Sequence, residues 1–63
     1  MITVNGESQE LLGTLAEQVA AVTEEQRGVA VAVNGEVVPR GAWAARHLEA
    51  GDTVEILTAA QGG

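Results

Sequence analysis

The sequence predicts an α+β fold, in which a mixed sheet of about four to five strands is covered on one face by one helix. Two Asn-Gly pairs, Asn5-Gly6 and Asn34-Gly35, stand between runs rich in β-branched residues, which is the pattern of tight β-hairpins. Thr14 and Glu17 have the spacing of a capping box, which predicts a helix between the hairpins. Residues 53–58 have the apolar alternation of a last strand.

The first hairpin and the helix account for the first part of the chain. Residues 1–4 and 7–12 are expected to be the two strands, because Asn and Gly both tolerate the positive φ of a type I′ turn. Gly13 ends the second strand, and the helix then runs to Val22. Its apolar stripe is expected to comprise Leu15, Val19 and Val22, with Leu12 and Ala16 as extensions.

The remaining part is expected to contain a second hairpin, a short helical segment and the last strand. Residues 29–33 are apolar throughout and pair with residues 36–38, where Pro39 ends the strand because it has no N–H to donate. Residues 40–50 have near-helical apolar spacing, too short for more than a turn or two of helix. We interpret Trp43 in this segment as a packing residue rather than as a ligand platform.

The order of these elements predicts the topology of the sheet. The first and last strands are not joined by a tight turn, so they can lie side by side and parallel at the sheet centre, linked through the helix. This arrangement is the β-grasp, or ubiquitin-like, fold, expected here as one domain over residues 1–63. Residues 59–63 have no periodicity and are expected to form a flexible C-terminal tail.

The composition excludes several classes of function. The sequence has no Cys, no Lys and no Tyr, which excludes thiolate, Schiff-base and phenol chemistry, and its single His is too few for a His-based zinc site. Nine acidic residues against three arginines give a net charge of −6, which disfavours nucleic acids and anionic membranes as partners. The longest apolar run, 29–33, is far too short to span a membrane. We therefore expect a cytoplasmic protein.

The side chains offer little catalytic chemistry. A triad would have to be built from Ser8, His47 and Asp52, and their spacing gives no reason to expect contact. Turn chemistry explains Ser8, and a favourable charge at the end of a short helical segment explains His47. The adjacent acids Glu24 and Glu25 are expected to be solvated, and no ligand loop for a divalent cation is present. We expect neither a catalytic residue nor a metal site in this chain.

The C-terminal pair Gly62-Gly63 is the remaining candidate. Neither residue has a Cβ, so the pair can enter a narrow active site of another protein, and its α-carboxylate is unhindered. By itself, such a pair is also typical of a frayed chain end.

Several motifs together are more selective than Gly-Gly alone. They are Met1-Ile2-Thr3-Val4-Asn5-Gly6, the helix start at 14–17, the run 29–34, Val37-Val38-Pro39-Arg40 followed by Trp43, Gly51-Asp52-Thr53-Val54-Glu55-Ile56 and Gln61-Gly62-Gly63. At this chain length, the combination resembles the sulfur carrier proteins of thiamine biosynthesis, which are small ubiquitin-like proteins of the ThiS type. The resemblance covers almost the whole chain.

The resemblance implies that this chain is a protein co-substrate and not an enzyme. A separate adenylyltransferase, similar to ubiquitin-activating enzymes, would use ATP and Mg²⁺ to convert the Gly63 carboxylate to an acyl-adenylate. A persulfide protein would then supply the sulfur that displaces AMP, and the resulting thiocarboxylate would donate its sulfur to thiazole synthase. Gln61 and Gly62 would thread into the partner. The resemblance implies no cofactor bound by this chain itself.

Partner docking is expected on the sheet face beside the tail. Val54 and Ile56 are expected to face the helix, so alternation places Leu57 on the open face. The alternative is that Leu57 is simply a tolerated surface residue. The acidic net charge of the chain favours basic partners. The candidate docking residues are Leu57, Ala59 and Ala60, with Ala30 or Ala32 nearby.

Two alternatives stay open from the sequence. Sulfur carriers for molybdopterin or cysteine synthesis also end in Gly-Gly, although they are usually longer and the stretch from Val38-Pro39-Arg40 to Trp43 argues against them. A ubiquitin-like binding or modifier module without a sulfur role would have the same fold and different chemistry.

Overall fold

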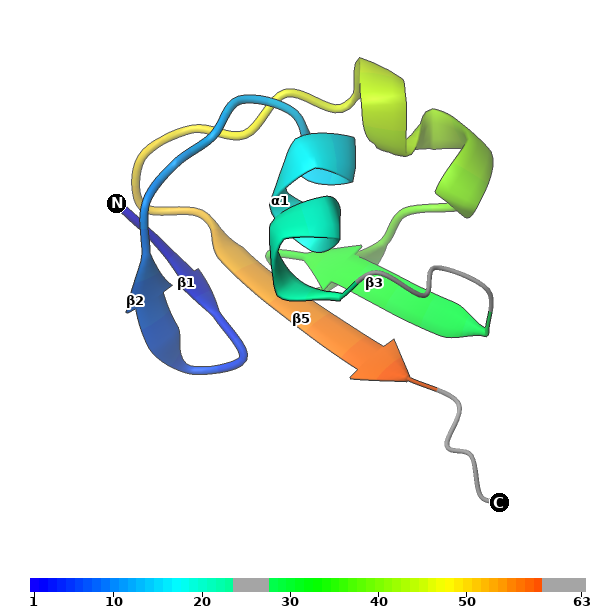
Figure 1. The fold of residues 1–63 in the computed structure, drawn as a ribbon, viewed down its shortest axis with the longest axis horizontal. Helices are drawn as coiled ribbons and strands as arrows, with labels where there is room; N and C mark the ends of the chain where they lie inside the picture. Colours follow the sequence, from blue (N-terminus) through cyan, green and yellow to red (C-terminus); the bar gives the residue numbers. More distant parts are fainter. Residues whose placement is uncertain (24–27, 59–63) are drawn as a thin grey trace.

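The computed structural model describes residues 1–23 and 28–58, which form a five-stranded sheet, one α-helix and a short 3₁₀-helix (Figure 1). The strand order in the sheet is β2-β1-β5-β3-β4, so β5 is the middle strand. In chain order, the elements are β1 (Ile2–Val4), β2 (Glu7–Gln9), α1 (Leu15–Val22), β3 (Val29–Val33), β4 (Glu36–Val37), the 3₁₀-helix η1 (Arg40–Ala45) and β5 (Thr53–Thr58).

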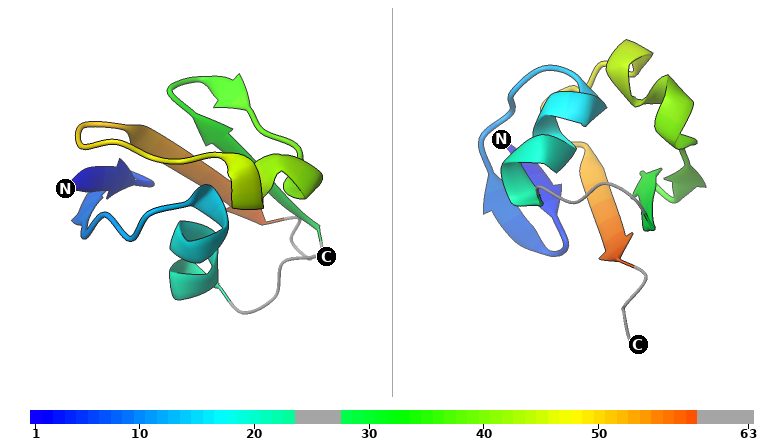
Figure 2. Two further views of the ribbon diagram at one scale, coloured as in Figure 1. Left: turned by 90° about the horizontal axis from the view of Figure 1, so that it is seen from above. Right: turned by 45° about the vertical axis from the view of Figure 1, so that its right-hand side comes forward.

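Strands β1 and β5 lie side by side and run parallel, with Thr3 paired to Thr53 and Val4 paired to Val54. The other strand pairs of the sheet are antiparallel. Helix α1 covers one face of the sheet, as the view from above shows (Figure 2). A parallel pair needs a crossover connection, and here the crossover contains α1. The predicted β-grasp fold is therefore confirmed.

The local signals for turns and for the helix start are also confirmed. Asn5 (φ 51°) and Asn34 (φ 53°) adopt the left-handed conformation, and the glycine after each also has a positive φ, as a type I′ turn requires. The Thr14 hydroxyl accepts from the Glu17 amide at 3.3 Å, and the Glu17 carboxylate accepts from the Thr14 amide at 3.0 Å. These two bonds form the predicted capping box.

The core lies between α1 and the sheet. Alternate residues of the three central strands point into it, whereas their neighbours point to the open face. The buried strand residues are Ile2, Val4, Val31, Val33, Val54 and Ile56.

The helix contributes a shorter apolar stripe than predicted. Leu15 and Val19 are fully buried, and Ala16 packs against the core from its edge. Val22 and Leu12 are each 43% exposed, so their predicted burial is wrong. Val22 is the last residue of α1, and no further helical turn covers it. Leu12 precedes the helix and belongs to the connection from β2.

The second strand is also shorter than the predicted 7–12. It ends at Gln9, which pairs with the first residue of β1, so the residues after Gln9 have no strand to pair with. The buried side chain of Gln18 supports them instead. Its Nε2 donates to the Glu10 carbonyl at 2.8 Å, and its Oε1 accepts from the Leu12 amide at 3.0 Å. The apolar pattern of the sequence did not predict this polar residue in the core.

Trp43 fixes the connection between β4 and β5. The 3₁₀-helix that carries it occupies the first six residues of the predicted helical segment 40–50. Trp43 is 2% exposed, and its indole N–H donates to the Val38 carbonyl at 2.8 Å, which confirms its interpretation as a packing residue. Strand β4 ends at Val37, one residue earlier than predicted, and Val38 is buried.

Candidate functional site

The predicted tail lies outside the described residues, as do the acids Glu24 and Glu25. The structure describes the strand that leads to the tail. Strand β5 ends at Thr58, five residues before Gly63. The site residues predicted beyond this strand are Ala59, Ala60, Gln61, Gly62 and Gly63.

The two neighbours of β5 hold it to different extents. Strand β3 pairs with it from Val33 opposite Val54 to Val29 opposite Thr58. Strand β1 pairs with it only at Thr53 and Val54. The end of β5 that precedes the predicted site is therefore paired along the β3 side, and strand pairing with β1 stops four residues earlier.

The sheet face opposite α1 carries a small apolar patch near the end of β5. Leu57 is 69% exposed, as predicted for this face, and it pairs with Ala30 of β3. Val37 is 72% exposed and pairs with Ala32. We call these four residues the open-face patch. Together with neighbouring residues of β3 and β5, they line a shallow depression of about 60 Å³.

Val37 was missing from the predicted docking residues, although the sequence carries a signal for it. A two-residue Asn-Gly turn fixes the register of a hairpin, so Val33 pairs with Glu36 and Ala32 pairs with Val37. Paired residues point to the same face of a sheet, so Val37 has to lie beside Ala32. The predicted turn was therefore sufficient to place it.

The start of β5 is held by a group of polar side chains. The Asp52 carboxylate accepts from the Glu49 amide at 2.9 Å and from the Asn34 side-chain amide at 3.0 Å. The side-chain oxygen of Asn34, Oδ1, in turn accepts from the Thr53 amide at 2.9 Å. The bond from Glu49, followed by the bond from Asn34 and the charge of Arg46, lowers the pKa of Asp52 below its ordinary value.

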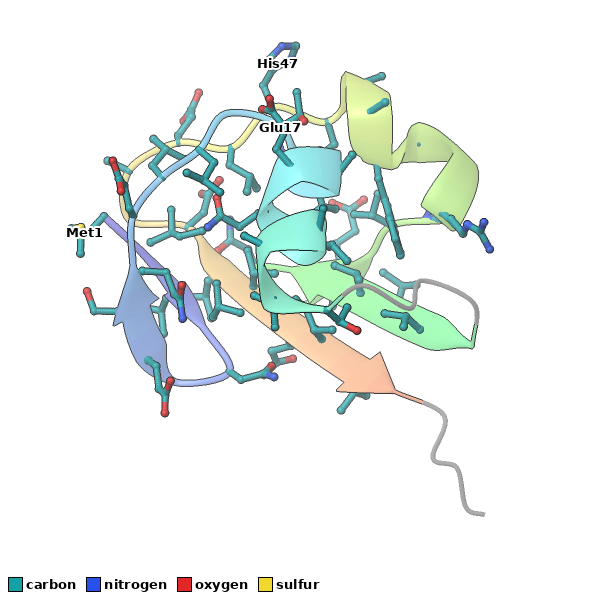
Figure 3. The ribbon with its side chains drawn as sticks, viewed as in Figure 1. Met1, Glu17 and His47 are labelled. Atoms are coloured by element: carbon teal, nitrogen blue, oxygen red, sulfur yellow. The ribbon has the colours of Figure 1, made fainter. Side chains whose placement is uncertain are left out.

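Ser8, His47 and Asp52 are not assembled into a triad. No hydrogen bond within residues 1–23 and 28–58 joins any two of them. Ser8 is exposed on β2, opposite Thr3. His47 is exposed and forms a β-bridge with Thr14. Its side chain points away from the fold, on the same side of the molecule as Glu17 (Figure 3).

The interpretation of His47 as a charge at a helix end is wrong. Helix η1 ends at Ala45 and has no basic residue in its last turn. Arg46 follows in an extended conformation, so the chain has left the helix before it reaches His47. The six residues of η1 make two turns of 3₁₀-helix, within the predicted one or two turns, and the segment ends before His47.

The described part of the chain holds no group of three or more His, Asp or Glu side chains that could bind a metal ion. Among the same residues, no helix is both long enough and apolar enough to cross a membrane. The described residues do provide a well-paired strand that leads toward the C-terminus and an exposed apolar patch beside it.

Comparison with protein families shows which family shares this sequence and fold. A sequence model of the ThiS family matches residues 2–63. The chain belongs to the ThiS family. Members of this family are small sulfur carriers of thiamine biosynthesis. Family membership therefore favours the thiamine pathway over the molybdopterin and cysteine alternatives. The matched range includes the whole described fold and also Gly62 and Gly63.

Solved structures of ThiS-type proteins share the fold. The crystal structure of the thiamine biosynthesis protein ThiS from Geobacter metallireducens is 36% identical, covers 98% of this chain and 97% of its own, and has a TM-score of 0.76. The NMR solution structure of a thiamine biosynthesis protein from the same organism is 37% identical, covers 98% and 86%, and has a TM-score of 0.75. No curated protein matches the chain.

Proposed function

We propose that this ThiS-family chain carries sulfur for thiazole synthesis as a thiocarboxylate on the C-terminal carboxyl group of Gly63. The match to the family extends to residue 63, which supports this choice of residue. The main observation behind the proposal is the position of β5. The middle strand of the sheet ends at Thr58, so only four residues separate a paired strand from Gly63.

The proposed chemistry begins with activation, because a carboxylate has no good leaving group. A partner adenylyltransferase uses ATP and Mg²⁺ to join the Gly63 carboxylate to the α-phosphate, and pyrophosphate leaves. The terminal sulfur of a protein persulfide attacks the carbonyl carbon, and AMP leaves, which gives an acyl disulfide. A thiol then reduces the disulfide bond and frees the thiocarboxylate, whose sulfur passes to thiazole synthase.

In this proposal the chain contributes a C-terminus that a partner can reach and side chains that do not react with the activated carboxyl group. Gln61, Gly62 and Gly63 enter the partner, and the two glycines have no Cβ that would clash with a narrow channel. The sequence contains no Cys and no Lys, so neither a thiol nor an ε-amine of this chain competes for the activated carboxyl group. The N-terminal amine is the main internal competitor.

The length of the terminal segment limits where a partner can bind. A fully extended chain spans about 3.3–3.6 Å per residue, so five residues reach at most about 17–18 Å beyond Thr58. A partner that receives Gly63 therefore has to bind near the end of β5. The open-face patch meets this condition, because Leu57 is exposed and directly precedes Thr58.

We assign partner docking to the open-face patch together with Ala59 and Ala60. An apolar group exposed on a sheet face is typical of an interaction surface. The net charge of −6 favours a basic partner, because complementary charge speeds encounter. The adenylyltransferase and thiazole synthase would use this surface in turn, since each has to receive the same C-terminus.

Intact-protein mass spectrometry tests the proposal. The chain is incubated with ATP, Mg²⁺, the adenylyltransferase of its pathway, a persulfide donor and a thiol that reduces the acyl disulfide. We expect one oxygen atom to be replaced by sulfur, and fragmentation should locate the change at Gly63. A variant lacking Gly63 is the control, which should fold normally and take up no sulfur. An unchanged mass, or sulfur located elsewhere in the chain, contradicts the proposal.

Complementation of a thiamine auxotroph tests the pathway separately. The full chain should restore growth without added thiamine, and the variant lacking Gly63 should not. Sulfur uptake in vitro combined with a failure to complement would indicate a carrier for another sulfur-dependent synthesis.

A further inference from the structure

The side chain of Asn5 continues the pairing between β1 and β5 after β1 has ended. The main chain of Asn5 still takes part in the ladder, since its amide donates to the Val54 carbonyl at 2.9 Å. Its side-chain Oδ1 then accepts from the Ile56 amide at 2.8 Å, and its Nδ2 donates to the Ile56 carbonyl at 3.1 Å. The side-chain amide thus replaces the next peptide group of a longer β1.

The turn conformation of Asn5 makes this replacement feasible. With a φ of 51°, the main chain of Asn5 leaves β5 and turns back into β2. The side chain remains directed at β5, because both of its polar groups bond to Ile56. One residue therefore closes the first hairpin and also holds the middle strand.

Ile56 lies close to the point where β5 ends. It is seven residues before Gly63, and strand β1 itself pairs with β5 no further than Val54. On its other side, β5 is paired with β3 up to Thr58. Among the described hydrogen bonds, the two from the Asn5 side chain are therefore those that hold the last part of β5 from the β1 side.

We propose that Asn5 is a positioning residue for sulfur loading, which keeps the end of β5 in the sheet so that the segment carrying Gly63 starts from a fixed point. This inference rests on the proposed function of Gly63. Without the two bonds to Ile56, the end of β5 itself has to be ordered when a partner binds the C-terminus. Ordering the end of this strand weakens binding but leaves the chemistry at Gly63 unchanged.

The second hairpin provides a matched control. Asn34 also begins an Asn-Gly turn, has a φ of 53° and makes two side-chain hydrogen bonds to the β5 region. Its partners are Asp52, which directly precedes β5, and Thr53, the first residue of β5. Both are distant from the C-terminal end of the strand. Asn5→Gly and Asn34→Gly both preserve the left-handed turn and each removes two side-chain bonds, at opposite ends of one strand.

The experiment measures KM and kcat of the adenylyltransferase for each carrier variant, at a temperature where urea titrations show all of them to be folded. For Asn5→Gly we expect KM to rise about fivefold to tenfold, as the loss of two hydrogen bonds predicts, with kcat almost unchanged. For Asn34→Gly we expect almost no change in either constant.

Hydrogen exchange provides a measurement that is independent of the enzyme. The Leu57 amide should exchange faster in Asn5→Gly than in Asn34→Gly when the two are compared at equal global stability. Equal KM values for the two glycine variants, or a fall in kcat alone, overturn the positioning role. If wild type is not adenylated at all, the proposed function fails, and this result is distinct from failure of the role of Asn5.

Discussion

The indole N–H of Trp43 donates a hydrogen bond to the main-chain carbonyl of Val38, 2.8 Å away in the core. Trp43 belongs to η1, whereas Val38 directly follows β4, so the bond ties the long connection to the sheet edge. Trp43 is also the sole aromatic residue of the sequence. One side chain therefore supplies both a large apolar surface and a satisfied polar group.

We expect substitutions of Trp43 to separate these two contributions. Trp43→Phe retains much of the apolar surface but leaves the Val38 carbonyl without its donor, which should cost about 1–3 kcal/mol of the free energy of unfolding. Trp43→Ala should cost about 3–5 kcal/mol, comparable with the total stability of a domain of this size. Urea unfolding followed by far-ultraviolet circular dichroism measures both values.

The control for Trp43 lies on the same 3₁₀-helix. Ala44 is exposed, so Ala44→Ser should change the free energy of unfolding by no more than about 0.5 kcal/mol. If Trp43→Phe is as stable as wild type, the bond to Val38 contributes nothing to the fold.

Gly13 is expected to be essential for the capping box. It has a φ of 131°, and a Cβ at this position would lie 2.6 Å from Oε1 of Glu17, the atom that accepts from the Thr14 amide. Gly13→Ala should therefore strain the main chain and displace the cap, at a cost of about 1–3 kcal/mol in thermal or urea unfolding.

Gly41 provides the matched glycine. A Cβ there meets nothing within 4 Å, and its φ is not in the left-handed range, so Gly41→Ala should be neutral or slightly stabilising. Similar losses for the two substitutions would show that the geometry at Gly13 has no special role.

The features predicted correctly from the sequence are those in which a local signal and the tertiary structure agree. Both Asn-Gly turns and the Thr14–Glu17 cap are determined within four residues, so their chemistry is visible in the sequence. The parallel pairing of β1 with β5 follows from the order of the elements and the need to cover one face of the sheet.

The errors arise where an element depends on a distant partner. The length of β2 is set by β1, which ends the pairing at Gln9. Burial of Gln18 depends on the main-chain groups of Glu10 and Leu12, which form no periodic pattern with it. Exposure of Val22 depends on where α1 ends, and helix ends are weakly determined by sequence. The choice of Gly63 comes from the family resemblance, because two glycines carry no tertiary information.

We expect Asp52 to make the stability of the fold depend on pH. Hydrogen bonds from Glu49 and Asn34 lower the pKa of Asp52 below its ordinary value of 3.8 in the folded state. A carboxyl group of this kind stabilises the fold above its unfolded pKa, and the contribution is lost as the pH falls through the folded pKa. Asp52→Asn has one side-chain oxygen for two donors, so it should be less stable than wild type at pH 7.

Urea unfolding at pH 7 and near pH 3 tests this expectation. The difference in free energy of unfolding between wild type and Asp52→Asn should shrink at the lower pH, where the wild-type carboxyl begins to be protonated. In an Asn34→Gly background, which lacks one of the two donors, the change with pH should be smaller. A difference that stays constant with pH contradicts the link between these bonds and the charge of Asp52.

Leu57 is the residue through which the open-face patch can be tested. Its side chain is 69% exposed, so Leu57→Glu should change the free energy of unfolding by less than about 1 kcal/mol, the range of strand propensities. If the patch docks the adenylyltransferase, a charge in place of Leu57 should weaken binding at least about tenfold, or about 1.4 kcal/mol. Calorimetric titration of the partner measures this dissociation constant.

Val22→Glu is the control for Leu57, because Val22 is also an exposed apolar residue but lies on α1, which covers the opposite face of the sheet. It adds the same charge and should leave the dissociation constant almost unchanged. Equal weakening by the two substitutions would indicate a general effect of negative charge and exclude docking on the patch. At saturating partner, Leu57→Glu should still accept sulfur at Gly63, because the substitution changes encounter and leaves the reacting carboxyl group intact.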